Sequence, residues 1–510
     1  MLRKYLKDCL NKMGKIYEQK ISDFSLGMTK DGRIPDTRYS QLLKNFDAHT
    51  YRHKLVPFRD SEAGNSLPDT SKVVNFTTAS VSSSLRLYAL EVVSGSSKAA
   101  IRYKTDFSGT DWTTPANNES SAGSRDEEFF IHYKNYIYGA RAGTNLWRHG
   151  DITGSPTWTD SWQSLTYTNM AQGLVHSKDD ILYIPYDNKI AKWDNTTFTA
   201  TALTLPSDRI ITSICEYGIF LAIGTKSSDG AGRSIVYLWE RDTSLNTLYE
   251  SIDWGAGNLQ ILEQVEGNLI GISFNSTNSF TAKITFRQYN DNTPTIFNEL
   301  VSTATYTAGD LTLSKQKIND NLYFLLTITF NGTKHQGLWK VGRIAPGLPF
   351  SLTFDRLPNN DTALTSGTLE GFYIVGDYVL IAYISSSAYG LSKTNDSAAF
   401  TATTSIWETT ILNLGDSSAT KKLLSVTAMT EALPSAGQIV VKYKKDEETS
   451  FTTIQTNTTD DSISKTSVNI ESSGAILPQF KEITFRVESI GNAVVTGLKF
   501  KAEFIDKDFN

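Results

Sequence analysis

The chain has 510 residues, of which 39% are hydrophobic, 20% charged and 11% aromatic, and its formal net charge is −5. Without a basic stripe, this charge disfavours nucleic-acid binding by the body of the protein. Two cysteines, Cys9 and Cys215, exclude a disulfide framework in practice. No stretch approaches the roughly 18 apolar residues of a membrane-spanning helix, and the first residues lack the apolar region of a signal peptide.

An apolar stripe predicts a helix from residue 1 to about residue 20. Its members recur every three or four positions, opposite a largely basic face. An isolated helix of this length is marginal in water, so we expect it to dock either on its own chain or on a neighbouring subunit. A membrane surface is disfavoured because the stripe lacks Trp and Phe. The stripe consists of Leu2, Leu6, Leu10, Met13, Ile16 and Tyr17.

Residues 21 to 66 contain isolated apolar anchors separated by turn residues. The anchors lie in segments 21–28, 42–47 and 55–60, around Gly32 and Pro35. Such spacing supplies little core of its own and predicts an extended arm that lies along another surface. We therefore expect an N-terminal helix plus an extended arm over residues 1–66.

Aromatic residues at nearly even intervals predict a repeat architecture over residues 67–415. The successive spacings are 44, 46, 46, 47 and 53, and each aromatic follows a short apolar run next to a charged residue. A period of about 40–50 residues in a strand-rich chain is typical of a β-propeller. The aromatics are Tyr103, Trp147, Trp193, Trp239, Phe286 and Trp339.

Seven apolar runs between these aromatics predict about seven blades, with six or eight as open alternatives. Near-continuous apolar runs indicate burial on both faces, so we interpret them as the inner strands of the blades. In the last unit Leu391 stands where the aromatic is expected, and residues 73–76 or 405–408 are candidates for closing the ring. The runs are 85–90, 136–138, 181–184, 219–223, 269–272, 322–326 and 378–382.

Residues 416–510 show a cleaner alternation of apolar and polar positions. Residues 415–418 form the predicted linker, and the period of two bounded by Gly, Pro and Ser predicts a C-terminal β-sandwich, jelly-roll-like in character. The fold class expected for the whole chain is therefore all-β. The alternating positions are Leu424, Val426, Ala428; Ile439, Val441, Tyr443; Ile483, Phe485, Val487; and Leu498, Phe500, Ala502, Phe504.

The sequence contains no recognisable catalytic constellation. It has no Gly-x-Ser-x-Gly elbow, no phosphate-binding glycine loop and no Cys-x-x-Cys pair. His49 and His53 lie four positions apart, but their surroundings do not favour a helix, so we interpret them as surface or anchoring residues and not as metal ligands. We predict no catalytic, cofactor-binding or metal-binding residue, and a protein that is not an enzyme. The remaining histidines are His132, His149, His176 and His335.

Two stretches resemble the Asp-box turn of sialidases and related propellers. They cover residues 105–113 and 151–159, and both depart from the usual spacing of Asp, Gly and Trp. In such a turn the Asp accepts backbone N–H groups, the Gly takes a positive φ and the aromatic packs between sheets. A stabilised turn is therefore favoured over any glycosidase role.

Other residues allow a ligand role, each beside a structural alternative. Trp158, Trp162 and Trp254 can stack on sugars, although packing between blades is favoured. A sialidase-like site would need three converging arginines, and spacing alone does not show convergence. An acidic turn at residues 446–448 can bind calcium, but a solvated turn is favoured. The available arginines are Arg102, Arg141, Arg148, Arg209 and Arg233.

Short motifs in the arm resemble a known family, together with the predicted propeller, which has regularly spaced aromatic residues, and the terminal sandwich. The motifs are Phe-Ser-Leu-Gly-Met at 24–28, Lys-Asn-Phe-Asp at 44–47 and Leu-Val-Pro-Phe-Arg-Asp at 55–60, with sandwich segments at 433–437 and 441–444. This layout resembles the propeller-bearing structural proteins of tailed bacteriophage virions, of the tail nozzle or neck-closure type. A Pro-Gly pair that follows the Asn-Phe segment in some such proteins is absent here.

The resemblance implies a non-enzymatic role in a symmetric assembly of the virion tail or neck. The expected partners are other copies of the chain and neighbouring virion proteins, bound through residues 1–66, with no sequence-specific nucleic-acid binding and no cofactor. The alternative is a carbohydrate-binding or glycan-degrading propeller, for example a receptor-binding tail component that recognises a host-surface glycan. A secreted adhesin is disfavoured because no signal peptide is recognised.

Overall fold

The structure is a computed structural model, and its regular elements among the described residues are all β-strands. Among these residues no helix is long and apolar enough to span a membrane. The described residues are 16–29, 33–63, 71–93, 98–109, 111–115, 119–123, 126–141, 143–150, 152–154, 156–229, 232–242, 250–278, 281–290, 292–302, 311–330, 333–356, 367–385, 388–395, 404–457, 465–469 and 478–505.

The chain divides into two compact units, each assembled from separate stretches of sequence. One unit, called here the propeller unit, contains residues 61–340 and 357–394. The other, called here the sandwich unit, contains residues 1–60, 341–356 and 395–510. The chain therefore passes between the units four times, and both of its ends belong to the sandwich unit.

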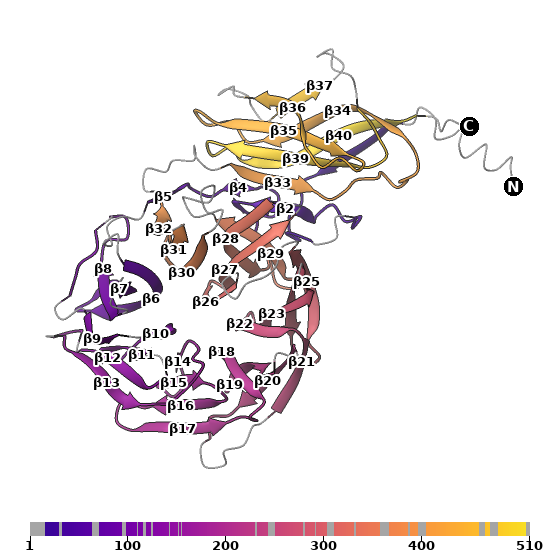
Figure 1. Cartoon of the computed structure of the whole chain (residues 1–510). Helices are drawn as coiled ribbons and strands as arrows, with labels where there is room; N and C mark the ends of the chain where they lie inside the picture. Colours follow the sequence, from indigo (N-terminus) through magenta and orange to yellow (C-terminus); the bar gives the residue numbers. More distant parts are fainter. Residues whose placement is uncertain are drawn as a thin grey trace. The chain divides into compact units, whose positions relative to one another are not determined.

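The propeller unit contains seven successive antiparallel sheets in its described part, arranged in a ring (Figure 1). With the innermost strand first, the first four sheets are β6 (Ser71–Val81), β7 (Ser84–Val93), β8 (Lys98–Lys104), β9 (Glu119–Gly123); β10 (Asp126–Tyr133), β11 (Tyr136–Arg141), β12 (Asn145–His149), β13 (Trp158–Ser164); β14 (Leu174–His176), β15 (Ile181–Tyr186), β16 (Lys189–Trp193), β17 (Phe198–Thr204); and β18 (Arg209–Tyr217), β19 (Phe220–Ser227), β20 (Arg233–Trp239), β21 (Glu250–Ala256).

The remaining three sheets complete the ring. They are β22 (Asn258–Val265), β23 (Asn268–Asn278), β24 (Thr281–Tyr289), β25 (Thr295–Ser302); β26 (Leu311–Ile318), β27 (Asn321–Phe330), β28 (Thr333–Gly342); and β30 (Thr368–Val375), β31 (Tyr378–Ser385), β32 (Ala388–Thr394), β5 (Ser61–Ala63). This succession of mostly four-stranded sheets is consistent with a β-propeller.

The core of this unit lies between neighbouring sheets. Each of six apolar clusters combines residues of two adjacent sheets, and one of them joins Val73 and Phe76 of the first sheet to Leu380 of the last. Between the fifth and sixth sheets, the rings of Phe286 and Phe324 lie 6.0 Å apart. Each sheet is thereby covered by its neighbours, which is why the apolar runs in the sequence are nearly continuous.

The six regularly spaced aromatic residues occupy one equivalent position in the repeat, as their spacing predicts. Each of the six lies in the third strand of its sheet, and Leu391 takes the same place in β32. The apolar runs, however, are not the inner strands. They form the second strand of each sheet, which has a hydrogen-bonded neighbour on both sides, whereas a more polar strand lies inside it. That part of the prediction is wrong.

The ring is closed by a strand that sequence patterning did not identify. Neither 73–76 nor 405–408 closes it. Instead, β5 pairs antiparallel with β32, with Glu62 opposite Lys393. The ion pair between these two side chains spans 2.8 Å, and the Lys393 side chain is 1% exposed. Three residues with one apolar side chain carry no periodic signal, so a closing strand of this length is invisible to pattern analysis.

Polar side chains join the innermost strands of neighbouring sheets. Gln316 donates to the Ile374 carbonyl over 2.9 Å and accepts from the Ile374 N–H over 2.7 Å. Gln172 does the same with Phe130, and the Ser213 hydroxyl with Leu262. These amides and hydroxyls satisfy backbone groups at the inner edge of each sheet, where the sheet itself offers no further strand.

The sandwich unit packs two sheets around a core that includes Phe485 and Phe500, whose rings are 5.1 Å apart. One sheet has the order β1 (Ile16–Ile21), β40 (Val495–Phe504), β34 (Lys421–Thr430), β37 (Lys465–Asn469), with β38 (Gln479–Phe480) also on β34. The other has the order β29 (Ser351–Arg356), β2 (Ser40–Lys44), β33 (Ser405–Thr409), β39 (Ile483–Ile490), β35 (Gln438–Lys445), β36 (Thr452–Asn457), and β3 (Phe46–Asp47) pairs with β4 (Val56–Pro57).

Two local expectations in this unit need correction. Residues 16–21 form a strand and not the end of a helix, because they pair along their whole length with β40; residues 1–15 of the predicted helix lie outside the described residues. In β34 the buried residue is Leu423 and not Leu424, since the pairing shifts by one residue between Leu423 and Ser425. Because such a bulge inserts one extra residue, the side chains before it point to the opposite face from the one that strict alternation predicts.

Candidate functional site

The arm motifs that carry the family resemblance lie within the sandwich unit. Strand β2 sits between β29 and β33, parallel to the first and antiparallel to the second. Phe24, Met28 and Phe46 are at most 1% exposed, and the Met28 N–H donates to the Leu352 carbonyl over 2.8 Å. These segments are therefore built into the sheet of their own chain.

Two residues of the Lys-Asn-Phe-Asp motif, Asn45 and Asp47, stabilise local turns. Asn45 adopts φ of 60°, a left-handed conformation that Asn tolerates better than most residues. Its side-chain amide donates to the Ser405 hydroxyl over 3.1 Å, and its N–H donates to the Phe354 carbonyl. Asp47 then accepts the N–H groups of His49 and Thr50, which closes the following turn.

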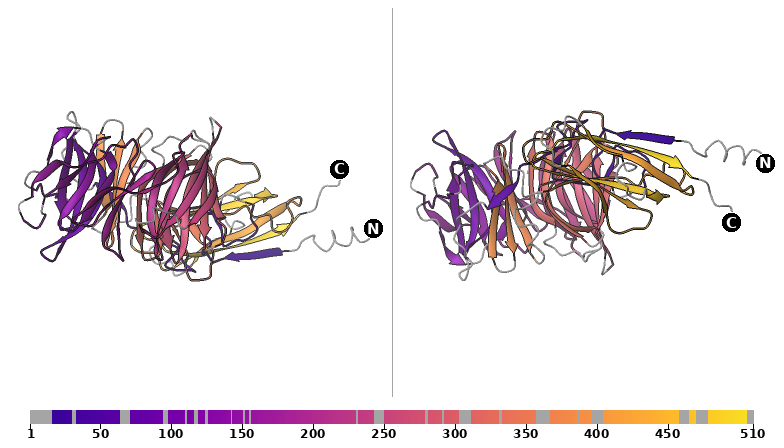
Figure 2. Two further views of the ribbon diagram at one scale, coloured as in Figure 1. Left: turned by 90° about the horizontal axis from the view of Figure 1, so that it is seen from below. Right: turned by 90° about the horizontal axis from the view of Figure 1, so that it is seen from above.

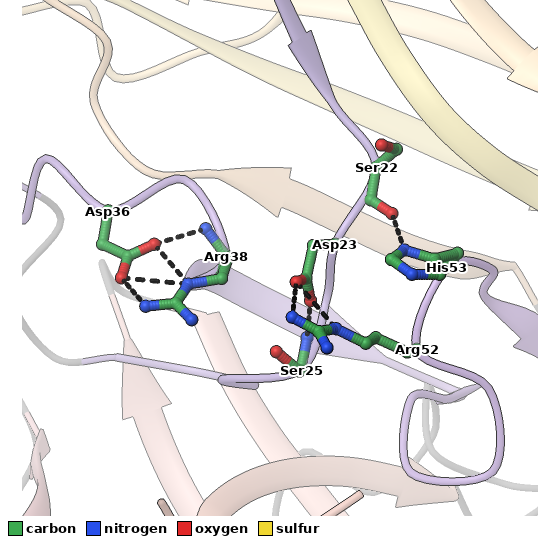
Figure 3. Close-up of polar contacts among 7 residues, drawn as sticks. All are labelled: Ser22, Asp23, Ser25, Asp36, Arg38, Arg52 and His53. Atoms are coloured by element: carbon green, nitrogen blue, oxygen red, sulfur yellow. Dashed lines mark hydrogen bonds and ion pairs between the residues drawn. The ribbon is translucent and has the colours of Figure 1, made fainter. Parts of the chain in front are cut away.

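Polar contacts hold the loops on either side of β2 (Figure 3). The Asp23 carboxylate accepts the Ser25 N–H over 3.0 Å and the Arg52 guanidinium over 2.8 and 3.0 Å. Asp36 accepts four contacts from Arg38: one from its backbone N–H, two from Nε and one from Nη2 over 2.6 Å. Both carboxylates thus fix a turn by binding nearby N–H groups and a guanidinium.

These contacts change the acidity of both carboxyl groups. Burial raises the pKa of Asp23, but hydrogen bonds from Ser25 and Arg52 outweigh it, so its pKa lies below the ordinary value of 3.8. The pKa of Asp36 is also lowered, mainly by its hydrogen bonds from Arg38. Both groups therefore favour the charged form in the folded chain.

The two arm histidines have separate partners. His49 Nε2 lies 2.7 Å from the Ser351 hydroxyl, whereas His53 donates from Nδ1 to the Ser22 carbonyl over 2.9 Å. Within the described ranges no group of three or more His, Cys, Asp or Glu side chains is placed to hold a metal ion. Their contacts are those of anchoring residues.

The first Asp-box-like stretch contains a side-chain-stabilised turn. Asp106 accepts the Ser108 N–H over 2.9 Å and its hydroxyl over 2.6 Å, and Trp112 is 9% exposed against Phe76. Gly109 does not have the expected positive φ. A Cβ at this position would lie 3.0 Å from Asp106 Oδ2, so the carboxylate leaves little room for a side chain there. In the second stretch Asp151 lies outside the described residues.

The candidate sugar-stacking tryptophans pack to different degrees. Trp254 is 1% exposed and its ring covers Gly271 of the next sheet. Trp158 is half-buried and stacks on Trp147 with ring centroids 4.7 Å apart. Trp162 is also half-buried, edge-on to Trp193 at 5.0 Å. Trp254 thus has an interior role, whereas the other two keep part of their surface accessible.

The candidate arginines are distributed over different strands, most with a local partner. Arg102 pairs with the buried Glu91 over 2.9 Å, and Arg148 lies 4.4 Å from the Tyr136 ring. Arg209 and Arg233 belong to one sheet, where Arg209 donates to the Arg233 carbonyl over 2.9 Å. Arg233 also pairs with Asp253. These contacts do not bring three guanidinium groups to one point.

The acidic turn of the sandwich unit is structural. Asp446 accepts the N–H groups of Lys481 and Glu482 over 2.7 and 3.1 Å, and Glu448 accepts the Lys445 N–H over 3.2 Å. The carboxylates bind backbone donors of a neighbouring loop and of their own turn, as stabilised turns do.

A polar cluster between the third and fourth sheets escaped sequence analysis. Asp179 accepts Arg241 Nε over 2.8 Å and the Tyr183 hydroxyl over 2.9 Å, and it lies 3.6 Å from Nδ1 of the buried His176. Burial lowers the pKa of His176 and raises that of Tyr183. Arg241 lies 62 positions after Asp179, so no local motif in the sequence indicates the cluster.

Comparisons with known proteins place the chain in no family. No family model matches the sequence, and no curated protein matches it. Solved structures match at the level of fold. They include Aleuria aurantia lectin in complex with alpha-methyl-L-fucoside (11% identity, 56% of this chain and 97% of that chain, TM-score 0.33), YCF48 from Cyanidioschyzon merolae (8%, 66% and 99%, 0.40) and Trypanosoma rangeli sialidase (10%, 95% and 95%, 0.33). Such low identities and scores carry nothing about ligands or activity.

Proposed function

We propose that this chain is a non-enzymatic structural protein of a tailed-bacteriophage virion, part of a nozzle-like tail or neck assembly. Its partners are other copies of itself and neighbouring virion proteins, in contact with residues 1–66. The observation that supports the proposal most directly is the position of the motifs at 24–28, 44–47 and 55–60, which carry the resemblance.

These motifs specify a particular construction of the chain. Phe46 and Leu55 are fully buried, Asn45 supplies a left-handed turn, and Asp47 caps the next one. We expect substitutions of Asn45 or Phe46 to disturb the packing where β2 lies between β29 and β33. A resemblance in these residues is therefore a resemblance in how the predicted arm is built into the sandwich unit.

The decisive experiment is proteomic and microscopic analysis of virions from a phage that encodes this chain. We expect its peptides in particles purified by density gradient, and gold-labelled antibodies against the propeller unit at the tail or neck in electron micrographs. Absence of the chain from purified virions, with its presence in the lysate, would contradict the proposal.

A second candidate function is glycan binding by the propeller, as in a receptor-binding tail component. The observation in its favour is the half-buried Trp162, which lies within 5.8 Å of the Arg148 guanidinium. A partly accessible indole beside a cation offers a stacking surface with adjacent donors.

A glycan array with the wild-type chain and Trp162→Ala separates this candidate from the first. Specific binding that the substitution abolishes, with an unchanged melting temperature, supports it. Trp254→Phe is the matched control, because that indole is buried away from solvent. No binding to any glycan leaves this candidate without support.

A further inference from the structure

We infer that the outer edge of β1 is an interaction surface for β1 of a second copy of this chain, paired antiparallel about a two-fold axis at Gln19. The inference goes beyond the proposed function, because it names a surface and a partner by which copies associate whether or not the chain belongs to a virion. It is drawn from the register, exposure and charges of residues 16–21.

Strand β1 is an edge strand with one side paired. Its six residues pair with β40 without a register break, from Ile16 opposite Glu503 to Ile21 opposite Leu498. It ends the strand order of its sheet, and within the described part of the chain no strand lies on its other side. Figure 2 shows it as the outermost strand beside β40 in the sandwich unit.

The edge lacks most devices that prevent strand addition. It contains no proline and no bulge, and it exposes Ile16 by 59% and Tyr17 by 37%. An edge of this kind presents alternate backbone N–H and C=O groups to another chain. Its protection against unspecific pairing consists of Glu18 and Lys20, so these charges decide which strand it accepts.

The charges of the outer face leave Lys20 without an acidic partner. Glu18 forms ion pairs with Lys499 and Lys501, the second over 3.1 Å. Lys20 lies directly opposite Lys499, and it has no ion pair among the described residues. Like charges in opposite positions destabilise a sheet, whereas an acid on the free side of Lys20 would stabilise it.

A second β1 supplies that acid in one register only. Residues opposite each other in an antiparallel pair share a face, so the two-fold axis must lie midway between one residue and the same residue of the second copy. An axis at Gln19 places Glu18 opposite Lys20 of the second copy, twice, and Tyr17 opposite Ile21 of the second copy. An axis at Glu18 or at Lys20 places like charges opposite each other. The charge pattern is therefore self-complementary about Gln19.

The test uses the full chain in sedimentation velocity over a concentration series. We expect reversible dimers, and Lys20→Glu to raise the dimer dissociation constant at least about tenfold, because both charge pairs become repulsive. The same substitution places an acid opposite Lys499 within the chain, so the melting temperature of the sandwich unit should stay equal or rise. A folding defect alone would instead raise the dimer dissociation constant and lower the melting temperature.

Two further samples complete the design. Lys481→Glu makes the same charge change on an exposed residue of the same unit away from the edge, and should leave the dimer unchanged. A mixture of Lys20→Glu with Glu18→Lys should recover association, because every cross-strand pair is then complementary. A wild-type chain that stays monomeric, or a dimer insensitive to Lys20→Glu, overturns the inference.

The outcome separates this inference from the proposed function. If the Lys20→Glu variant still forms oligomers, the chain associates through another surface, and the proposed virion role is unaffected. A dimer that depends on Lys20, in a chain absent from purified virions, removes the virion role and keeps the edge.

Discussion

Glycines opposite aromatic rings set the packing within the propeller sheets at the scale of single residues. Gly139 is paired with Trp147, and a Cβ at this position would lie 2.0 Å from Cζ2 of that ring. Gly390 stands in the same relation to Tyr383 at 2.3 Å. The absence of a side chain leaves room for each ring over the neighbouring strand, so in these two sheets the aromatic residue and its glycine act as one pair.

We predict that Gly139→Ala destabilises the propeller unit by about 1–3 kcal/mol, because the methyl group overlaps the indole and must displace it. Thermal unfolding followed by circular dichroism measures the effect as a lower melting temperature. In a Trp147→Leu background the additional loss should be much smaller, since the overlapping ring is gone. An equal loss in both backgrounds would place the strain elsewhere.

A second residue-scale prediction concerns Asp23 and Arg52. The folded pKa of Asp23 is lowered below 3.8, so this pair contributes stability that is present above the unfolded pKa and is lost as the pH falls through the folded pKa. Arg52→Ala should therefore lower the melting temperature at pH 6, and the difference from wild type should shrink as the pH drops below about 4.

The control is Asp23→Asn, which removes the titrating group. In this background Arg52→Ala should have an effect that does not depend on pH between 3 and 6. A wild-type difference that stays constant over this range would show that Arg52 acts through packing and not through the Asp23 charge.

At the scale of elements, the innermost strands depend on side-chain ties that differ from sheet to sheet. Lys315 of β26 lies 2.9 Å from the Glu263 carboxylate and 2.9 Å from the Ile214 carbonyl, and it also contacts the Leu262 carbonyl. One ammonium group thus links strands β18, β22 and β26, each from a different sheet. Its side chain is 12% exposed, so water competes little for these acceptors.

We predict that Lys315→Met destabilises the propeller unit by about 1–3 kcal/mol, because two carbonyls and a carboxylate lose a buried donor. The measurement is a urea unfolding curve of the full chain, monitored by tryptophan fluorescence. Lys317→Met is the matched control on the same strand, as its side chain is exposed, and should have little effect. Equal effects of the two substitutions would contradict this role for Lys315.

The same elements show which parts of the fold can be predicted from sequence. The third strands are recognisable because Trp147, Trp193 and Trp239 recur in one setting, and packing between sheets imposes that recurrence. The innermost strands cannot be recognised from sequence, because polar residues in them, such as Gln316 and Ser213, resemble those of loops. Patterning also fails where burial depends on distant partners, as for Asn45 with Ser405.

At the scale of the whole molecule, the described residues of the predicted arm belong to both units. They supply β1 to β4 to the sandwich unit and β5 to the propeller unit. Strand β2 lies inside one sheet, between β29 and β33, and the Trp407 indole of β33 donates to the Ser40 hydroxyl of β2 over 3.1 Å. Residues that look like a tether in the sequence are therefore integral to the fold.

We predict that deletion of residues 1–66 prevents folding of the sandwich unit and opens the last propeller sheet at β32. Of the described strands, deletion of residues 1–21 removes only β1, and it should leave a folded chain. Limited trypsin digestion with mass spectrometry distinguishes the two: rapid cleavage throughout residues 404–505 is expected only for the longer deletion. A protease-resistant sandwich unit without residues 1–66 would contradict this prediction.

The pairing of β1 with β40 joins nearly the two ends of the chain, and it has a consequence for synthesis on the ribosome. At about 5–20 residues per second, residues 16–60 emerge on the order of a minute before their partners near residue 500 exist. The buried side chains of this segment also wait for partners made later, since Phe24 packs on Trp407 and Met28 bonds to Leu352. If translation stops before β40 is made, β1 has no strand to pair with. The edge that β1 would present to a second copy then does not form.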